Sequence, residues 1–272
     1  MRRMYESVGM KKGTLLTKIG IGIVLVFASL FLITLATLPS FQDIQNLALG
    51  SNRFYLDQNQ KVIHELRVDL QKRRKLWLPL NSYSQVLQDW VVGIEDKNFF
   101  HHPGVDVFAL ARATYSMASG KRIQGASTIS MQTEDLIEPS VLLESQPITK
   151  GRVFGKVKQI FRGFAIDLLW SKQEILETYL NLVHLRGEVQ GVQSFSQLYL
   201  GKSPLFINET EAVVIATLIQ APNRQKDSLI KRSCLLGKGR KTDFSCDKLE
   251  AVVDRLQKGA VPMQEPPQLA PH

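Results

Sequence analysis

Residues 95–106 read EDKNFFHHPGVD, and residues 125–132 read GASTISMQ. The first stretch places two acidic residues directly before a run of aromatic residues, histidines and a glycine. The second places short hydroxyl and amide side chains after Gly125, a composition typical of a loop whose backbone approaches a ligand closely. The alternative for this second stretch is an ordinary Ser/Thr turn that caps a helix.

A helix is predicted directly before Glu95, beginning near Ser84. Apolar side chains recur there at the spacing of one helical face, namely Val86, Leu87, Trp90, Val91 and Ile94. Because that face would be buried, Glu95 would be held rigidly at the edge of a cleft. Asp96 follows one residue later, about 100° further round a helix, so the two carboxylates would not share a face.

The rest of the chain is predicted to be mainly α-helical with one small β element. Residues 53–69 indicate a strand, a turn and a second strand. Further helices are expected at residues 107–118, 152–170, 209–220 and 246–258, and one more follows the capping box that Ser171 forms with Glu174. The helix over 152–170 has a predicted core stripe of Val157, Ile160, Phe161, Phe164 and Leu168. Residues 138–151 are expected to be irregular, and the Pro-rich tail is expected to be extended.

Residues 19–38 contain no charged side chain, and at about 1.5 Å per residue they span a hydrocarbon core of about 30 Å. Basic residues outnumber acidic ones before them, so residues 1–18 are predicted to stay in the cytoplasm and everything after Pro39 to lie outside the membrane. A cleaved signal peptide is the alternative, although Leu38 is too large for the usual cleavage site.

The composition limits the possible partners. The chain has 272 residues, 44% of them hydrophobic, and a net charge of +9 that is spread over several segments. Such a balance suits anionic partners such as pyrophosphate and lipid headgroups. No zinc-finger spacing or RNA-binding aromatic signature is present, so we expect no nucleic-acid partner. Cys234 and Cys246 are either a disulfide, which an extracytoplasmic compartment permits, or two unrelated thiols.

Five motifs in order resemble those of the peptidoglycan glycosyltransferases (family 51). They are EDKNFFHHPGVD at 95–106, GASTISMQ at 125–132, GKVKQ at 155–159, KQEILETYLN at 172–181 and RGEVQGVQSFSQLYLGKSP at 186–204. The phrases GASTISMQ, GKVKQ, YLGKSP and QAP look like the glycosyltransferase half of penicillin-binding proteins of the 1C type. The resemblance implies a mainly α, lysozyme-like catalytic domain seated on the membrane, without the transpeptidase domain that normally follows.

The apolar segment, the charges before it and the resemblance together divide the chain into five predicted parts. These are a cytoplasmic N-terminus (1–18), a transmembrane anchor (19–38), a juxtamembrane β-hairpin and linker (39–80), the glycosyltransferase domain (81–225), and a C-terminal helix with a Pro-rich tail (226–272). The resemblance implies that Glu95 is the general base, a role in which a positioned carboxylate adds roughly 10²–10⁴-fold. Asp96 is expected either to orient the site or to have a structural role. For Glu95 the alternative is a cap or salt bridge at a helix end.

Substrate binding is also assigned by resemblance. Ser127, Thr128 and Gln132 match residues that contact substrate sugar and phosphate. Cations are expected near the leaving pyrophosphate, since they stabilise charge that develops in the transition state; those that match are Arg112, Lys156, Lys158 and, one residue out of register, Arg152. The alternative for each cation is a solvated helix face. A divalent cation, Mg²⁺ or Mn²⁺, is expected to help, with its ligands unknown.

The chain departs from the common family pattern at three positions. Glu134 and Asp135 stand where many members have a Lys-Asn pair, and Gln159 stands where many have a second glutamate. A glutamine cannot donate a catalytic proton or balance a metal ion, although relatives of the 1C type share it. Asp167 lies eight residues later, about 12 Å along a helix, so it cannot replace that glutamate and is expected to be structural. His102 is expected to be a hydrogen-bonded histidine rather than a metal ligand.

The predicted function is polymerisation of lipid II into β-1,4-linked glycan strands, with release of undecaprenyl pyrophosphate. The protein is expected in the bacterial inner membrane, as a single-pass protein with a periplasmic catalytic domain that binds lipid II and the nascent glycan strand. A separate transpeptidase or other cell-wall synthases are open as partners. The first alternative is a catalytically weak scaffold that binds the precursor, motivated by Glu134, Asp135 and Gln159. The second is a muramidase-like hydrolase.

Overall fold

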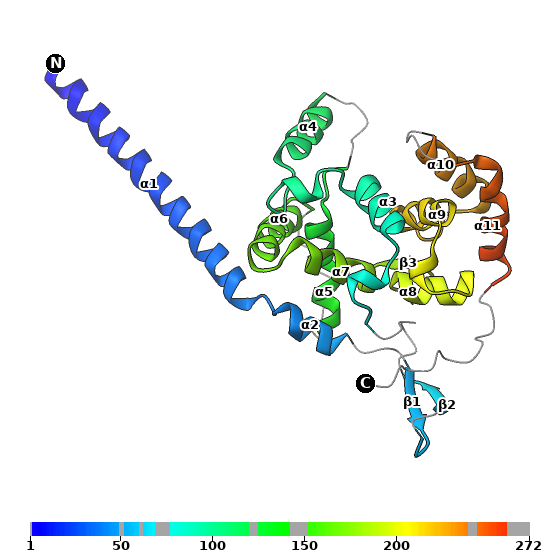
Figure 1. Cartoon of the computed structure of the whole chain (residues 1–272). Helices are drawn as coiled ribbons and strands as arrows, with labels where there is room; N and C mark the ends of the chain where they lie inside the picture. The colour runs from blue at the N-terminus through cyan, green and yellow to red at the C-terminus, as the bar shows by residue number, and fades with distance from the viewer. Residues whose placement is uncertain are drawn as a thin grey trace. The chain divides into compact units, whose positions relative to one another are not determined.

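The structure is a computed structural model that describes residues 2–48, 52–59, 62–68, 77–119, 125–141, 152–238 and 244–259. Its contacts divide the chain into two compact units, Met1–Pro39 and Ser40–His272. Helices dominate the described residues, and the strands form two-stranded sheets (Figure 1). The predicted fold class, mainly α with a small β element, is therefore confirmed.

The first unit is helix α1, Arg2–Thr37. Its segment Thr17–Thr37 is 21 residues long, with a mean hydropathy of 2.7, and is long and apolar enough to cross a membrane. Large apolar side chains along it, such as Leu25 and Leu32, are exposed. A signal sequence near an N-terminus meets the same criteria of length and composition.

The second unit begins with a helix that the sequence did not predict, α2 (Phe41–Leu47). Ser40 caps it, because its hydroxyl accepts from the backbone N–H of Asp43 while the Asp43 carboxylate accepts from Ser40 N–H. Phe41 makes edge contacts with Trp77 and Trp170, with ring centroids 6.0 and 5.6 Å apart. These aromatic contacts attach the first helix of the unit to its core.

The remaining elements follow in chain order. They are β1 (Asn52–Leu56), β2 (Val62–Arg67), η1 (Leu80–Ser82), α3 (Gln85–Glu95), η2 (Phe99–His101), α4 (Val107–Ala118), α5 (Ile129–Val141), α6 (Arg152–Leu169), α7 (Lys172–Leu182), β3 (His184–Arg186), β4 (Val189–Gln190), α8 (Val192–Phe195), η3 (Ser196–Leu200), η4 (Pro204–Phe206), α9 (Glu209–Gln220), α10 (Lys226–Gly237), η5 (Cys246–Lys248) and α11 (Leu249–Gln257). Strands β1 and β2 form the antiparallel hairpin that the sequence predicts. Helix α10 was not predicted.

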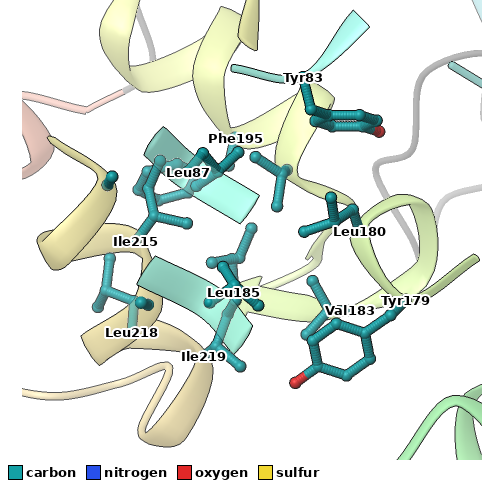
Figure 2. Close-up of a cluster of buried hydrophobic side chains, with 14 of the residues drawn as sticks. Tyr83, Leu87, Tyr179, Leu180, Val183, Leu185, Phe195, Ile215, Leu218 and Ile219 are labelled. Carbon is teal, nitrogen blue, oxygen red and sulfur yellow. The ribbon is translucent and has the colours of Figure 1, made fainter. Parts of the chain in front are cut away.

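Helices α3 and α9 form the centre of the core. Helix α9 is buried on all sides from Glu211 to Ile219, as expected of a helix enclosed by others. Figure 2 shows Leu87 of α3 in one apolar cluster with Ile215 of α9 and Phe195 of α8. The predicted face of α3 is confirmed at Leu87, Trp90 and Val91, but it is wrong at Val86, which is 40% exposed. Glu95 is the last residue of α3, as predicted.

Helix α5 was not predicted, and helix α6 differs from the prediction in which of its residues are buried. The loop predicted over 125–132 ends at Thr128, where α5 begins, and α5 extends into the residues predicted to be irregular; residues 142–150 lie outside the described part. Helix α6 has nearly the predicted length, but Val157 is 38% and Leu168 is 68% exposed, so its core stripe was wrong at both ends. The buried positions among its described residues are Gly163, Ala165 and Ile166 instead.

Cys234 of α10 and Cys246 of η5 form a disulfide across a separation of 12 residues. This resolves the alternative left open by the sequence. Closing a loop of this length stabilises a fold by about 3 kcal/mol, chiefly by restricting the unfolded chain.

We expect the double substitution Cys234→Ser with Cys246→Ser to lower the free energy of unfolding by about 2–3 kcal/mol. The measurement is urea unfolding of the oxidised protein with and without reductant, beside the double variant. Reductant should lower the wild-type midpoint and leave the variant unchanged. Equal midpoints for the oxidised wild type and the variant would show that the bond adds nothing.

Candidate active site

Glu95 has one carboxylate oxygen fixed by a hydrogen bond and one that accepts no hydrogen bond from the residues that the structure describes. The side-chain amide of Gln132 on α5 donates to Oε2 at 3.0 Å. The other oxygen, Oε1, is buried and accepts no hydrogen bond from the described residues. Burial raises the pKa of Glu95; the amides of Gln132 and nearby Gln220 act in the opposite direction, and the charge of Asp96 adds to the rise. A rigid carboxylate with a raised pKa and a free oxygen has the properties of a general base.

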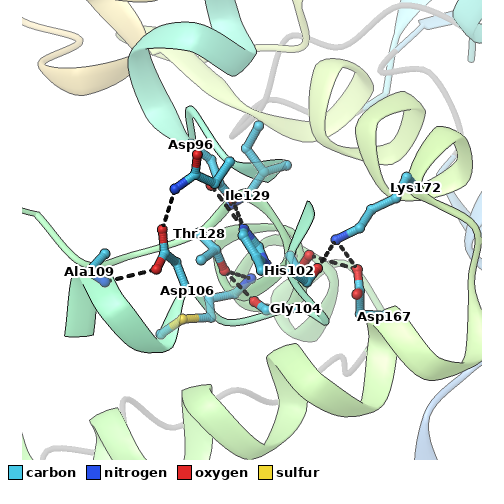
Figure 3. A network of polar contacts seen from close by, with 12 residues as sticks. Asp96, His102, Gly104, Asp106, Ala109, Thr128, Ile129, Asp167 and Lys172 are labelled. Carbon is cyan, nitrogen blue, oxygen red and sulfur yellow. Dashed lines mark hydrogen bonds and ion pairs between the residues drawn. The ribbon is translucent and has the colours of Figure 1, made fainter. Parts of the chain in front are cut away.

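Asp96 belongs to a network of polar contacts that joins several elements (Figure 3). It is the C-cap of α3, with φ −155°, and it is 6% exposed. Its Oδ2 accepts from Ile129 N–H at 3.0 Å, and both of its oxygens lie 3.0 Å from Nε2 of His102. Asp96 therefore ties the end of α3 to the start of α5. His102 is hydrogen-bonded, as predicted.

Asp106 and Thr128 cap the two helices beside this network. Asp106 accepts from the N–H of Ala109 at 2.8 Å and from the amide of Asn98 at 2.9 Å, and these bonds lower its pKa. The Thr128 hydroxyl donates to the carbonyl of Gly104 at 2.5 Å and accepts from the N–H of the third residue of α5 at 3.2 Å. Thr128 is 2% exposed, so its geometry supports the helix-cap alternative rather than contact with substrate.

Lys172 joins α7 to the same network (Figure 3). Its ammonium lies 2.6 Å from the Asp167 carboxylate, donates to the carbonyl of His102 at 2.8 Å, and lies 4.6 Å from the centroid of the Phe99 ring. Asp167 also accepts from Ser130 at 3.2 Å. Asp167 thus holds α5, α6 and α7 together, which is the structural role expected of it.

Lys156, Ser127 and Gln159, which the motifs assign to substrate binding, lie together. The Lys156 ammonium donates to the Ser127 hydroxyl at 3.0 Å and to the Gln159 carbonyl at 2.7 Å. The amide of Gln159 donates in turn to Asp135. Burial lowers the pKa of Lys156, and the charge of Asp135 opposes that shift. The cluster is a cation inside a set of hydroxyl and amide groups, with one carboxylate beside it.

One face of α5 connects this cluster to Glu95. Gln132, which binds Glu95, and Asp135, which accepts from Gln159, are three residues apart on α5. Residues at that spacing are neighbours on one helical face, about 4.5 Å apart along the axis. The carboxylate and the Lys156 cluster therefore lie along the same side of one helix.

The other predicted residues fall into three groups. Arg112 is exposed on α4, and Lys158 is half-buried on α6. Helix α6 begins at Arg152, whose side chain lies outside the described part. Glu134 is 2% exposed and paired with Arg162, so this acidic departure from the family pattern is neutralised inside the fold.

Sequence reasoning missed three residues of the site. Tyr179 of α7 donates to the carbonyl of the Gln132 amide at 3.0 Å. Gln220 ends α9 close to Glu95, and Arg162 holds Glu134. No pattern in the sequence indicated these contacts, because the burial of Glu134, which makes a nearby cation necessary, is seen only in the structure.

A helical domain with a buried carboxylate near a cluster of one cation with hydroxyl and amide groups has the kinds of group that a group-transfer enzyme uses. The sequence matches the family Transglycosylase over residues 59–238, more than half of the chain, and the chain belongs to this family. The family supports a glycosyl-transfer activity and the lysozyme-like fold.

Two curated relatives are penicillin-binding proteins. Penicillin-binding protein 1C of Escherichia coli (strain K12) is 40% identical over 135 residues, which are 49% of this chain and 16% of the relative. Penicillin-binding protein 1A of Vibrio cholerae is 31% identical over 204 residues, 75% of this chain and 23% of the relative. The chain thus spans less than a quarter of either. A solved penicillin-binding protein 1A from Haemophilus influenzae aligns over 80% of this chain and 22% of its own at 18% identity, with a TM-score of 0.36, too low for any conclusion.

Proposed function

We propose that the chain is a peptidoglycan glycosyltransferase that polymerises lipid II into β-1,4-linked glycan strands and releases undecaprenyl pyrophosphate. Its membership of the transglycosylase family and its similarity to penicillin-binding proteins support this function. The observation that carries the proposal is the state of Glu95, with Oε2 held by Gln132 and Oε1 buried without a hydrogen-bond partner among the described residues.

In the proposed reaction, Oε1 of Glu95 takes the proton from the 4-hydroxyl of the acceptor lipid II. The oxygen of this 4-hydroxyl forms the new bond to the anomeric carbon of the donor strand. The bond between this carbon and the pyrophosphate oxygen breaks, and the electron pair leaves with the pyrophosphate. A sugar hydroxyl is a weak nucleophile at neutral pH, so a positioned base accelerates this step.

The leaving pyrophosphate needs positive charge. Lys156 is the proposed contact, since Ser127 and Gln159 already direct its ammonium, and Lys158 and Arg112 are further candidates. We also propose that a divalent cation binds together with the pyrophosphate of the substrate. The described residues contain no group of three His, Cys, Asp or Glu that could hold a metal, and Gln159 brings no charge. We therefore derive no step through a metal ion.

The proposed location is the bacterial inner membrane. The Thr17–Thr37 segment has the length and hydropathy of a membrane span, and the basic residues before it favour a cytoplasmic N-terminus. On this proposal, residues 19–38 are the anchor, residues 81–225 are the periplasmic catalytic domain, and the lipid-linked substrate is reached without leaving the bilayer. A separate transpeptidase or another cell-wall synthase is a proposed partner.

The test is incubation of the purified full chain, in detergent or liposomes, with labelled lipid II. Polymer that a muramidase digests would support the proposal. Binding of lipid II without polymer would favour the scaffold, which the carboxylate of Asp135 beside Lys156 and the neutral Gln159 motivate. Release of fragments from finished cell wall, without polymer from lipid II, would favour a hydrolase.

Arg112→Ala is expected to lower the rate of polymerisation at least about tenfold, the size of one lost charge-assisted contact. Its thermal stability should change little, because Arg112 is exposed. Lys231→Ala is the matched control, because it removes one exposed cation from α10. Equal rates for both variants would remove Arg112 from the site.

A further inference from the structure

Three helices meet in a short hydrogen-bonded chain that ends on Glu95. The hydroxyl of Tyr179 on α7 donates to Oε1 of the Gln132 amide on α5 at 3.0 Å. Nε2 of the same amide donates to Oε2 of Glu95, at the end of α3, at 3.0 Å. Tyr179 is 0% exposed, and Figure 2 shows it beside Val183 at the edge of the apolar cluster.

The chemistry of the three groups allows only one donor-to-acceptor direction for these two hydrogen bonds. An ionised carboxylate accepts hydrogen bonds and donates none. The amide therefore faces Glu95 with its N–H, and its carbonyl faces Tyr179, which must donate. Burial raises the pKa of Tyr179 well above its usual value, and the charges of Glu95 and Asp96 reinforce the rise. The phenol thus stays protonated and remains a donor.

Resting on the proposed function, we propose that Tyr179 is a positioning residue whose hydroxyl holds the Gln132 amide in the one orientation that donates to Glu95. The substrate does not touch it. Its effect is to keep the carboxylate in the ionised, proton-accepting state and to leave Oε1 directed at the acceptor sugar. A tyrosine buried in the core thereby sets the working pH range of the enzyme.

The groups that face Glu95 come from four directions. Asp96 disfavours the ionised form of Glu95 from the same helix end, while Gln132 from α5 and Gln220 from α9 favour it, and Tyr179 from α7 acts through Gln132. Without the Tyr179 hydroxyl, the Gln132 amide is free to turn its carbonyl towards Glu95. A protonated Glu95 can donate to that carbonyl and an ionised Glu95 cannot, so the additional orientation favours the protonated form.

The test compares Tyr179→Phe with Tyr83→Phe. Tyr83 is the matched control, because it is 2% exposed and its hydroxyl also donates to an amide oxygen, that of Asn181, at 3.0 Å. We expect the acid limb of kcat/KM against pH to move up by about one unit in Tyr179→Phe, a tenfold change in the protonation equilibrium. Tyr83→Phe should leave the limb in place, although both variants lose stability.

A second readout does not need activity. In protein labelled with ¹³C at the glutamate carboxyl carbons, the Glu95 signal is assigned by its loss in Glu95→Gln. Its titration midpoint should rise in Tyr179→Phe and stay unchanged in Tyr83→Phe. An unchanged midpoint in folded Tyr179→Phe, or an equal rise in both variants, overturns the proposal.

If Tyr179→Phe does not fold, Gln132→Met takes its place, because methionine has similar length and cannot donate to Glu95. Gln132→Met should also raise the titration midpoint of Glu95. An unchanged midpoint would again overturn the role proposed for the hydrogen bonds from Tyr179 through Gln132 to Glu95. Failure of the proposed function looks different. Wild type would then make no polymer, or Glu95→Gln would make as much as wild type, while the carboxyl titration still decides the role of Tyr179.

Discussion

Glu95→Gln is expected to lower the initial rate of lipid II polymerisation by about 10²–10⁴-fold, the usual contribution of a general base. Glutamine keeps the shape of the side chain and can still pair with the Gln132 amide, but it cannot take a proton. The measurement is the initial rate of polymer formation by the purified full chain. A rate within threefold of wild type would exclude Glu95 as the base.

The same substitution should leave the fold intact and stabilise it at neutral pH. Burial raises the pKa of Glu95 above its unfolded value. A carboxyl group with a raised pKa contributes most to the free energy of unfolding below about pH 4. This contribution is lost as the pH rises through the raised pKa. At pH 7 the wild type therefore contains a poorly solvated charge that glutamine removes. We expect Glu95→Gln to have a melting temperature equal to or above wild type at pH 7, with the difference vanishing near pH 4.

Asp96→Asn provides the contrast one residue away. Asp96 accepts from Ile129 N–H and lies against His102, so this change weakens the junction of α3 and α5. Its melting temperature and its rate should fall together. The roles of the two carboxylates are reversed if Glu95→Gln lowers both the melting temperature and the rate, while Asp96→Asn lowers only the rate.

The sequence was sufficient to place Glu95 because two independent signals agree there. The apolar spacing of Leu87, Trp90 and Val91 predicts a buried helical face, and the motif places an acid at its end. The same reasoning failed on α6, where Val157 and Leu168 are exposed. Helix α6 buries Gly163, Ala165 and Ile166 instead. The glycine presents bare backbone to its neighbours and the alanine is small, so neither stands out in an apolar pattern.

The polar site was predicted only where motif order carries the information. Ser127, Lys156 and Gln159 were grouped because their motifs are grouped, and the structure brings them together. The contact of Tyr179 with Gln132 joins residues 47 positions apart on two helices. Its existence depends on how α5 packs against α7, and neither residue type demands the other as a partner.

Gly104→Ala is expected to have the largest effect on stability of any single methyl group added to the site. Gly104 has φ +78°, and a Cβ there would lie 2.0 Å from the carbonyl oxygen of Gly163 and 2.6 Å from its carbon. The obstructing atoms are helix backbone, which cannot rotate aside as a side chain can. The positive φ costs about 1–2 kcal/mol for an L-residue, and the clash adds the cost of displacing α6. We expect a loss of more than about 4 kcal/mol, or no folding.

Gly201→Ala separates the two contributions, because Gly201 has φ +66° with no atom within 4 Å of an added Cβ. It should lose only the conformational part, about 1–2 kcal/mol, measured by urea unfolding of both variants beside wild type. Equal losses in the free energy of unfolding at the two positions would mean that α6 moves away from the added methyl group without a free-energy cost. The displacement also predicts the activity of any folded Gly104→Ala protein. Thr128 donates to the Gly104 carbonyl and Lys156 of α6 donates to Ser127, so moving α6 away separates the cation from its hydroxyl partner, and polymerisation should be lost even where the fold survives.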